Sequence, residues 1–464
     1  MRAPGAVLLI SCYEQGHQPL GLVMPAARLE AKGFSPSLLD ISVEEFDELR
    51  AARASLVAIS VPMHTALRLG IEVAKRVRRV NPRCHISFYG LYAALNAEHL
   101  LDTVADSCFG GEFEDALVRL AVTLDGGGNV QPFQHPPVRR EELQSARRHK
   151  RRTALASRKG LPPLERYVKL IDGTARRTVG YVATTRGCKH LCLHCPIPPV
   201  YDGAFIAVPA DAVLEDVAQL VDAGATHITF SDPDFFNGPA HARRIVRAMH
   251  ERFPFVTFDY TAKVEHLLRH RSLVRELQAL GCVFVVSAIE SLNDRTLDNL
   301  KKGHSGNDVI DVIHFFKSIG LALRPSLLPF TPWDSLQDYI ELLDMIEREG
   351  MIDHVDPVQY GVRLLVPPRS SLLASDAMTP HLDALDREGL TYRWHHPDTR
   401  MDELQRRVSR LVEDATASGE DAAVTFYRIR DLADSLGGRD ASSILLDYPA
   451  DRPMPPRLSE DWFC

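Results

Sequence analysis

Three cysteines within eight residues are the strongest chemical signal in this sequence. Cys188, Cys192 and Cys195 form a Cys-x3-Cys-x2-Cys motif, whereas the remaining cysteines are scattered along the 464 residues. In a reducing compartment, a tight group of cysteines binds metal more often than it forms disulfides. An iron–sulfur cube normally takes four protein thiolates. Three thiolates therefore predict a 4Fe-4S cluster with one iron open to a ligand, as in other catalytic metal sites.

A structural zinc site is the alternative interpretation of this motif. His190 or His194 would then supply the fourth ligand. Structural zinc sites usually pair two short ligand-bearing turns, and no second pair of cysteines follows in the sequence. We therefore favour the cluster.

The elements that must position the motif follow a repeating strand–helix pattern. Apolar runs predict strands at 178–185, 226–231, 256–261, 282–288, 322–328 and 357–365. Helices are expected between them, at 209–223, 239–252, 271–280, 306–318 and 335–348. Six such units favour a partial (β/α)6 barrel. The cysteines come directly after the first strand, at the end where barrels carry their active-site loops.

An α/β domain and a helical region are expected to flank this barrel. Strands at 5–11, 55–61 and 84–89 alternate with helices at 20–32 and 65–80, which predicts a doubly wound parallel sheet. Further helices are expected at 402–416 and 421–436. The predicted parts are an N-terminal α/β domain, a linker with a basic helix, the partial barrel, a helical C-terminal region and a Pro-rich tail, at 1–124, 125–177, 178–380, 381–448 and 449–464. The tail should be extended or poorly ordered.

Charge and hydropathy exclude some partners. The net charge of -7 gives no global attraction to nucleic acid or to an anionic membrane. The basic run at 139–152 has no interleaved aromatics, so we expect a solvated helix there and no nucleic-acid partner. The first apolar run, at 5–11, is too short to span a bilayer. These features predict a cytoplasmic protein without a membrane partner.

The cysteine motif and its setting resemble the radical SAM superfamily over residues 178–366. The resemblance implies that the open iron binds the amino and carboxylate groups of S-adenosylmethionine (SAM). One electron, from a reductant such as ferredoxin or flavodoxin, then breaks a C–S bond and makes a carbon radical. One position departs from the family: the residue before the third cysteine is usually aromatic and packs near the adenine, and here it is His194.

The same resemblance implies which strand ends hold SAM. Polar groups after strand 226–231 would bind the methionine ammonium, so Asp232 and Asp234 are candidates. Helix capping is the alternative role for either aspartate. A cation after the next strands would pair with the methionine carboxylate, and Lys263 and Arg324 are placed to do so.

Three more residues complete this predicted cofactor site. Glu290 and Ser291 follow strand 282–288, where the family binds the ribose hydroxyls. Arg363 lies near the end of the last predicted strand and is a further candidate for the pocket.

An N-terminal α/β domain before such a barrel is similar to the cobalamin-binding radical SAM architecture. Glu112, in Gly110-Gly111-Glu112, lies in a segment that looks like the end of that domain type. The Asp-x-His-x-x-Gly pattern that supplies a histidine to cobalt is absent, and the lone His64 is no substitute for it. Two expectations stay open: cobalamin binds without a protein ligand to cobalt, or the domain has a different role.

A narrower radical SAM group, with cysteine-rich or selenocysteine-containing tails, is also similar to this chain. The resemblance rests on residues 11–21, 232–235 and 261–266 and on the cysteine motif. Tails of that group read Cys-Cys-Ala-Glu-Pro or Cys-Sec-Ala-Glu-Pro, whereas this sequence stops at Cys464. One hypothesis is that the reading frame continues with selenocysteine after Cys464. A genuine terminus is the alternative.

A related tail-bearing group resembles the enzymes of arsinothricin biosynthesis, which transfer the 3-amino-3-carboxypropyl group of SAM to trivalent arsenic. Soft thiolates suit a soft element, which makes Cys12 and Cys464 candidate catalytic residues. We expect an enzyme that cleaves SAM reductively and modifies a small molecule by radical chemistry. The alternatives are this group transfer, cobalamin-dependent methyl transfer and, from another class, a non-catalytic cluster or cobalamin sensor.

Overall fold

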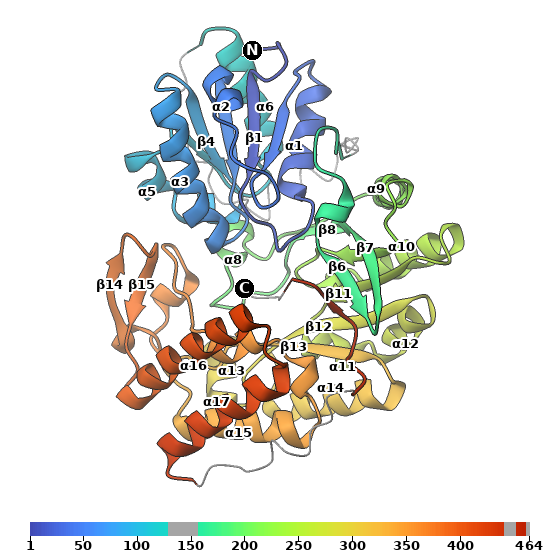
Figure 1. Ribbon diagram of the computed structural model, residues 1–464, viewed down its shortest axis with the longest axis vertical. Coiled ribbons are helices and arrows are strands. Elements are labelled where there is room, and N and C mark those ends of the chain that lie inside the picture. Colours follow the sequence, from blue (N-terminus) through green and yellow to red (C-terminus); the bar gives the residue numbers. More distant parts are fainter. Residues whose placement is uncertain (129–155, 440–451, 461–464) are drawn as a thin grey trace.

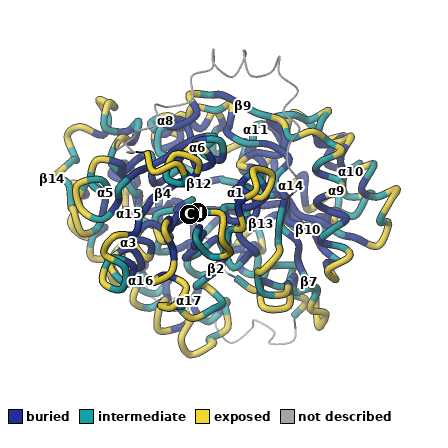
Figure 2. The backbone as a smooth tube through the Cα atoms, turned by 90° about the horizontal axis from the view of Figure 1, so that it is seen from above, coloured by how far each residue is buried: buried dark blue, intermediate teal, exposed yellow. Residues whose placement is uncertain are grey.

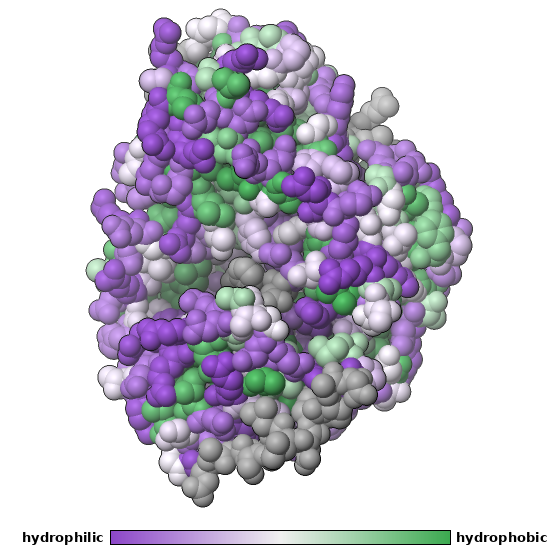
Figure 3. Space-filling view, viewed as in Figure 1, coloured by the Kyte–Doolittle hydropathy of each residue, from purple (hydrophilic) through white to green (hydrophobic). Residues whose placement is uncertain are grey.

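The computed structural model describes residues 1–128, 156–439 and 452–460 and contains two large sheets (Figure 1). The N-terminal domain lies at the top of Figure 1, and the second sheet and the C-terminal helices lie below it. Strands of both sheets are buried in Figure 2, whereas exposed segments lie at the periphery. The face seen in Figure 3 is mostly hydrophilic. No helix of the described residues is long and apolar enough to cross a membrane.

The N-terminal sheet is parallel, as the sequence predicts, with strand order β2-β1-β3-β4-β5. Its strands are β1 Val7–Ser11, β2 Ser37–Asp40, β3 Leu56–Ser60, β4 His85–Tyr89 and β5 Ser107–Phe109. Its helices are α1 Leu20–Glu30, α2 Glu48–Arg53, α3 His64–Val80, α4 Leu91–Leu95, α5 Ala97–Thr103 and α6 Glu114–Asp125.

Helices cover both faces of this sheet, so its strands read as continuous apolar runs. Along β1, Leu8 and Ile10 pack with the face that carries α2, α3 and α5. Val7 and Leu9 pack with α1 and α6 on the opposite face. This alternation explains why every residue of β1 is buried.

The second sheet is a partial barrel with strand order β13-β12-β11-β10-β7-β6-β16. Five of its strands are parallel: β7 Ala175–Val182, β10 His227–Phe230, β11 Thr257–Thr261, β12 Cys282–Glu290 and β13 Ala322–Leu327. Two antiparallel strands extend its edge, β6 Lys169–Asp172 and β16 Arg457–Leu458. Its covering helices are α9 Ala210–Asp222, α10 Pro239–Arg252, α11 Val264–Arg269, α12 Arg271–Ala279, α13 Asp294–Asn299, α14 Gly306–Ile319 and α15 Leu336–Arg348.

The predicted sixth parallel strand, 357–365, is wrong. Its first half forms the 3-10 turn η4 Pro357–Gly361, and only Arg363 makes a strand-like bridge, with Phe330. The Gln359 side chain accepts the hydrogen bond of the Leu327 N–H at the edge of β13. A side chain therefore satisfies an edge donor that a sixth strand would otherwise have paired.

The two ends of the barrel sequence also differ from expectation. The sheet begins in the predicted linker, because β6 forms a hairpin with β7 at residues 169–182. The predicted extended tail adds β16 to that hairpin. The expected basic helix at 139–152 lies outside the described residues.

The C-terminal region contains a hairpin and two long helices. The hairpin consists of β14 Leu382–Asp386 and β15 Thr391–Trp394, and the helices α16 Thr399–Ser418 and α17 Ala422–Gly437 lie where helices were predicted. Short helical turns connect other parts of the chain: η1 Leu164–Arg166, η2 Phe235–Asn237, η3 Ile352–His354, η5 Ser371–Ala374 and η6 Thr379–His381.

Candidate active site

The cysteine loop is held by a small antiparallel hairpin. Strand β8 Thr185–Gly187 pairs with β9 Phe205–Ala207, and the turn α8 Pro198–Tyr201 lies between them. Gly187 has a φ of 69°, and a Cβ there would lie 2.3 Å from the Ala204 carbonyl oxygen. The residue before Cys188 must therefore be glycine.

All three cysteines line one cavity of about 350 Å³ between the N-terminal domain and the barrel. The loop after β1 and the start of α4 supply its upper wall, which includes Gln15, His17, Leu91 and Tyr92. The carboxyl ends of the barrel strands supply the opposite wall. Ligands of open α/β sheets and of barrels bind at this end of the strands.

The three cysteines lie on one loop and line the same cavity. They do not belong to the one group of three ligand atoms that, among the described residues, could hold a single metal ion. Three thiolates on one loop suit an iron–sulfur cube with one iron left open, so the donor set fits the predicted cluster.

Two residues from the next strand end hold this loop in place. Asp232 accepts hydrogen bonds from the Thr184 N–H and hydroxyl, at 3.0 and 2.7 Å, and from the Thr185 hydroxyl. Asn237, which the sequence did not single out, donates to the Cys188 sulfur at 3.4 Å. Both carboxylate oxygens of Asp232 thus already accept hydrogen bonds that position the start of the cysteine loop. Its contact with a methionine ammonium stays a prediction.

Asp234 lies between two imidazoles. Its Oδ2 is 3.2 Å from His190 Nε2 and 2.7 Å from His266 Nδ1, while its Oδ1 accepts the Phe236 N–H. Burial raises the pKa of Asp234, but the two imidazoles outweigh burial and lower it to about 2. Oδ1 of Asp234 thus caps the helical turn η2, as the alternative role predicts. The contact of Asp234 with a methionine ammonium stays a prediction.

Two cations reach the cavity from β11 and β13. Arg324 pairs with Asp356 through Nη2, while its buried Nη1 has no hydrogen-bond partner among the described residues. Lys263 Nζ lies 3.2 Å from His190 Nδ1. Both side chains line the cavity, where an unpaired guanidinium nitrogen can bind a carboxylate.

Glu290 lies at the end of β12 with a φ of 68°, a left-handed conformation that is costly for a non-glycine residue. Its Oε1 is 2.9 Å from Lys302 Nζ and 3.3 Å from His194 Nε2. Burial raises the pKa of Glu290, but Lys302 and His194 outweigh burial and hold it well below its usual range. Lys302, which is not one of the predicted site residues, is buried and lines the cavity.

Of the remaining predicted site residues, Ser291 and Cys12 lie away from the cavity and Arg363 lies at its wall. Ser291 is not among the described residues that line the cavity, because its hydroxyl donates to Asp334 inside the fold. Arg363 reaches the cavity wall, but its guanidinium binds Asp402 and the Trp394 carbonyl. Cys12 is buried in the core of the N-terminal domain, and burial, helped by Asp40, raises its pKa to about 12, the opposite of a reactive thiolate. Cys464 lies outside the described residues.

A partly buried ion-pair group joins the N-terminal domain to the cysteine loop. Arg186 of β8 lies 3.1 Å from Glu112 and 2.6 Å from Glu114, and Tyr201 donates to Glu112 at 3.1 Å. The sequence pointed to Glu112 but not to its partner. His64 lies farther along the domain edge, where its Nε2 is 2.8 Å from the Gly389 carbonyl oxygen.

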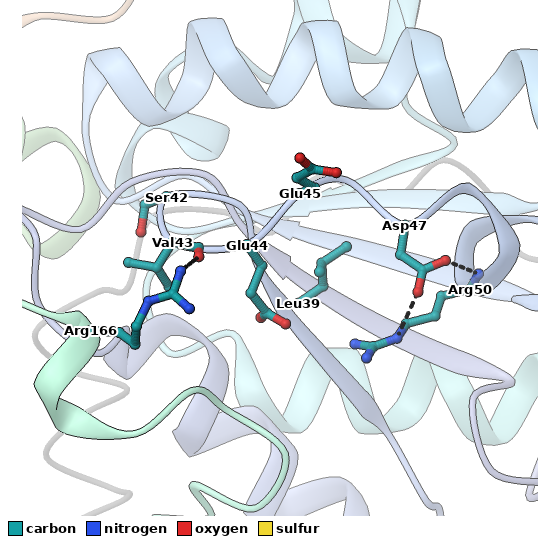
Figure 4. Close-up of a pocket in the computed structure, with 8 residues that line it drawn as sticks. All are labelled: Leu39, Ser42, Val43, Glu44, Glu45, Asp47, Arg50 and Arg166. Atoms are coloured by element: carbon teal, nitrogen blue, oxygen red, sulfur yellow. Dashed lines mark hydrogen bonds and ion pairs between the residues drawn. The ribbon is translucent and has the colours of Figure 1, made fainter.

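A second depression, of about 740 Å³, lies beyond the carboxyl end of β2 (Figure 4). Several of its charged groups already have partners: Asp47 pairs with Arg50, Glu44 accepts the Asp40 N–H, and Arg166 donates to the Val43 carbonyl. The side chains in Figure 4 point in different directions and do not converge. This surface therefore carries no candidate chemistry.

Comparison with known proteins identifies two domains in this chain. Residues 182–346, which include all three cysteines, match the sequence model of the radical SAM superfamily. The chain contains a radical SAM domain. Residues 6–121 match the B12 binding domain. The two matches imply a 4Fe-4S cluster and SAM and support cobalamin as a further cofactor.

Curated relatives of this chain include a methylase and a methylthiotransferase. The hopanoid C-3 methylase of Methylococcus capsulatus is 22% identical over 338 residues, which are 68% of this chain and 62% of that protein. The ribosomal protein uS12 methylthiotransferase RimO of Chlorobium chlorochromatii is 22% identical over 178 residues, 36% of this chain and 40% of that protein. The chain thus spans less than two thirds of the length of either relative.

Two solved structures share the fold. The cobalamin-dependent radical enzyme OxsB, with aqua-cobalamin and SAM bound, has a TM-score of 0.66 at 12% identity, over 95% of this chain and 74% of that chain. TsrM from Kitasatospora setae, with cobalamin and a [4Fe-4S] cluster bound, has a TM-score of 0.57 at 16% identity, over 75% and 73%. At such identities the likeness shows the fold alone.

A cobalamin bound by the N-terminal domain would face the upper wall of the cavity. His17 stacks on Tyr181 of β7 with ring centroids 4.1 Å apart. Burial lowers the pKa of His17 to about 3, so its imidazole is neutral. The His64 ring nitrogen that faces Gly389 is already engaged. The residues that fit cobalamin are thus the apolar and neutral groups after β1 and β4.

Proposed function

We propose that this enzyme binds SAM in the cavity between its two domains, cleaves it reductively there, and modifies a small molecule held in the same space. The observation that most supports this proposal is that the three cysteines, Arg324 and Glu290 line one cavity. A donor set for the cluster, a cation for a carboxylate and an acceptor for hydroxyls thus face one another.

Each side chain has a binding or positioning task in this proposal. When bound, the cluster supplies one electron to SAM, which breaks a C–S bond and gives a carbon radical. Arg324 Nη1 and Lys263 hold the methionine carboxylate, and Glu290 accepts from the ribose hydroxyls. His194, fixed by Glu290, lies beside the cysteines. The enclosed space between the domains keeps water away from a reactive radical.

Anaerobic reconstitution tests this proposal. The protein is loaded with iron and sulfide, reduced with dithionite and incubated with SAM, and the nucleoside products are separated. Release of 5′-deoxyadenosine or methylthioadenosine supports the proposal and identifies the broken bond. A fully loaded protein that releases neither nucleoside contradicts it. A flavodoxin or ferredoxin replaces dithionite in a second series, because we expect one of these as the reductant.

Cobalamin-dependent methyl transfer is the second candidate. The B12-binding domain over residues 6–121 and the likeness to a hopanoid methylase favour it. The absorbance spectrum of protein purified with cobalamin supplied, together with transfer of an isotope-labelled methyl group from SAM, tests it. Absence of the corrin bands after such purification would count against methyl transfer.

Transfer of the 3-amino-3-carboxypropyl group to a soft element remains a third proposal, carried only by the sequence resemblance. Methylthioadenosine would then be the released nucleoside. Cys464 would be needed and Cys12 would not, since Cys12 is buried in the domain core.

A further inference from the structure

A second group of potential ligand atoms lies beside the cysteines. His190 Nε2, Asp234 Oδ2 and His266 Nδ1 come from the cysteine loop, the end of β10 and the start of α11. They lie within 4.8 Å of one another, and this is the one such group of three among the described residues. Two of its separations, 3.2 and 2.7 Å, are close to the roughly 3.0–3.5 Å expected between neighbouring ligands of one zinc or iron ion.

These three atoms are buried and contact only one another among the described residues. The contacts of Asp234 Oδ2 with the two imidazoles lack good hydrogen-bond geometry, and none of the three atoms has a further partner among the described residues. The Asp234 side chain is 1% exposed and that of His266 is 11% exposed. Buried polar atoms are nearly always paired. Atoms that converge without pointing at one another are arranged as ligands of a common ion are, rather than as donors and acceptors.

The carboxylate is held in place from behind. Asp234 Oδ1 accepts the Phe236 N–H at 3.0 Å, which leaves Oδ2 directed at the two imidazoles. Such supporting hydrogen bonds orient metal ligands in known sites. The imidazole rings lie 4.8 Å apart and are tilted by 58°, so they are not stacked against each other.

We propose that His190, Asp234 and His266 bind one divalent transition-metal ion beside the cluster. Two histidines and one carboxylate suit zinc or iron(II) and leave further coordination positions open. His190 and Asp234 line the cavity, so those positions lie at its wall. The ion would bind water or an anionic oxygen of a substrate next to the cysteines. This site does not depend on SAM cleavage.

The contact of Lys263 with His190 competes with metal binding. The ammonium nitrogen of Lys263 lies 3.2 Å from His190 Nδ1, the nitrogen that must carry a proton when Nε2 binds a metal. An ammonium cannot accept that proton in a hydrogen bond. Lys263 must therefore turn away when the metal binds, and its contact with a SAM carboxylate gives it another partner. Removal of Lys263 should strengthen metal binding.

Zinc loading tests the site. Cluster-reconstituted full-length protein receives one equivalent of Zn²⁺ and is desalted, and iron and zinc are then counted by mass spectrometry. The wild type should retain about one zinc per chain. Zinc-edge X-ray absorption should show nitrogen and oxygen neighbours at about 2.0–2.1 Å and no sulfur at about 2.3 Å. Retention by H266Q and D234N should fall at least tenfold, and the neighbouring H270Q should retain zinc.

Two outcomes overturn the proposal. One is a wild type that retains no more zinc than H266Q. The other is sulfur scattering, which would place the zinc at the cysteines. If H266Q and D234N fail to keep their clusters, K263M decides, because it leaves all three ligands in place. Its zinc affinity should rise at least threefold, and an unchanged or weaker affinity contradicts the proposal.

Discussion

Arg324 and Glu290 show how single residues prepare the cavity for a zwitterionic cofactor. Arg324 keeps one guanidinium nitrogen on Asp356 and leaves the other buried without a partner among the described residues. Glu290 is ionised by Lys302 and His194 in spite of its burial. The methionine carboxylate of SAM would accept from the unpaired nitrogen of Arg324, and the ribose hydroxyls would donate to Glu290. Each side chain would thus gain a hydrogen-bond partner from SAM.

The substitution R324M should lower the affinity for SAM by about tenfold to a hundredfold, since a hydrogen bond to a charged group contributes about 1.5–3 kcal/mol. Isothermal titration of the reconstituted protein under anaerobic conditions measures the change. The exposed Arg176 on the same sheet gives the control R176M. Equal affinity in R324M and R176M, with equal cluster content, would show that Arg324 does not hold the carboxylate.

Glu14 predicts a pH effect on stability. It is buried after β1, accepts from the Leu20 and Gly21 N–H groups, and burial outweighs these bonds and raises its pKa to about 7. An unfolded glutamate titrates near 4.3, so between these values the folded chain binds more protons. Stability from this group is therefore lost as pH rises from about 4.3 to 7.

The substitution E14Q removes that titration. Between pH 5.5 and 8 the melting temperature of the wild type should fall relative to that of E14Q, on the order of a few degrees. Thermal unfolding at both pH values measures the difference. Parallel pH dependence in the two proteins would mean that Glu14 is already ionised at pH 5.5.

At this scale the sequence predicts ligands that are close in the chain and misses groups that meet only in the fold. Cys188, Cys192 and Cys195 were readable because seven positions separate the first from the last. His266 joins His190 across 76 positions. The prediction for Cys12 rests on the polar residues that follow it in the sequence. These residues do not show that the Cys12 side chain itself faces the core.

Among the elements, β8 is the link between the domains and the cysteines. Arg186 of β8 lies two residues before Cys188. It pairs with Glu112 and Glu114 of the N-terminal domain. The edge strand β16 makes a second link, because Glu460 just after it accepts from Tyr13 of the β1 loop at 2.7 Å. The Pro-rich composition predicted an extended tail but not its pairing with β6, since a two-residue strand leaves no pattern.

Loss of the β8 link should destabilise the protein. R186M leaves the buried Glu114 and the half-buried Glu112 without their cation. Removing one partner of a buried pair typically costs about 3–5 kcal/mol, so a loss of up to this size is expected. We expect a lower denaturant midpoint and fewer iron atoms retained per chain after reconstitution, because the same strand leads into the cysteine loop. R176M serves again as the exposed control. A midpoint and iron content equal to those of the control would refute this role.

At the scale of the whole molecule, two sheets direct their carboxyl ends at one cavity. The loop after β1 and the start of α4 face the ends of β10 to β13 across the cysteines. The alternation of strands and helices predicts both sheets, because each strand is a buried apolar run between amphipathic helices. It cannot show that residues 357–365 stop short of a sixth strand, since Gln359 caps β13 through a side chain.

The most direct test of the central claim is whether SAM binds the cluster held by Cys188, Cys192 and Cys195. Electron–nuclear double resonance of the reduced, reconstituted protein with ¹⁵N-amino-labelled SAM measures this contact. A ¹⁵N coupling to the cluster signal is predicted in the wild type, with neither cluster signal nor coupling in C192A. An intact cluster signal without ¹⁵N coupling, at saturating SAM, would contradict the account.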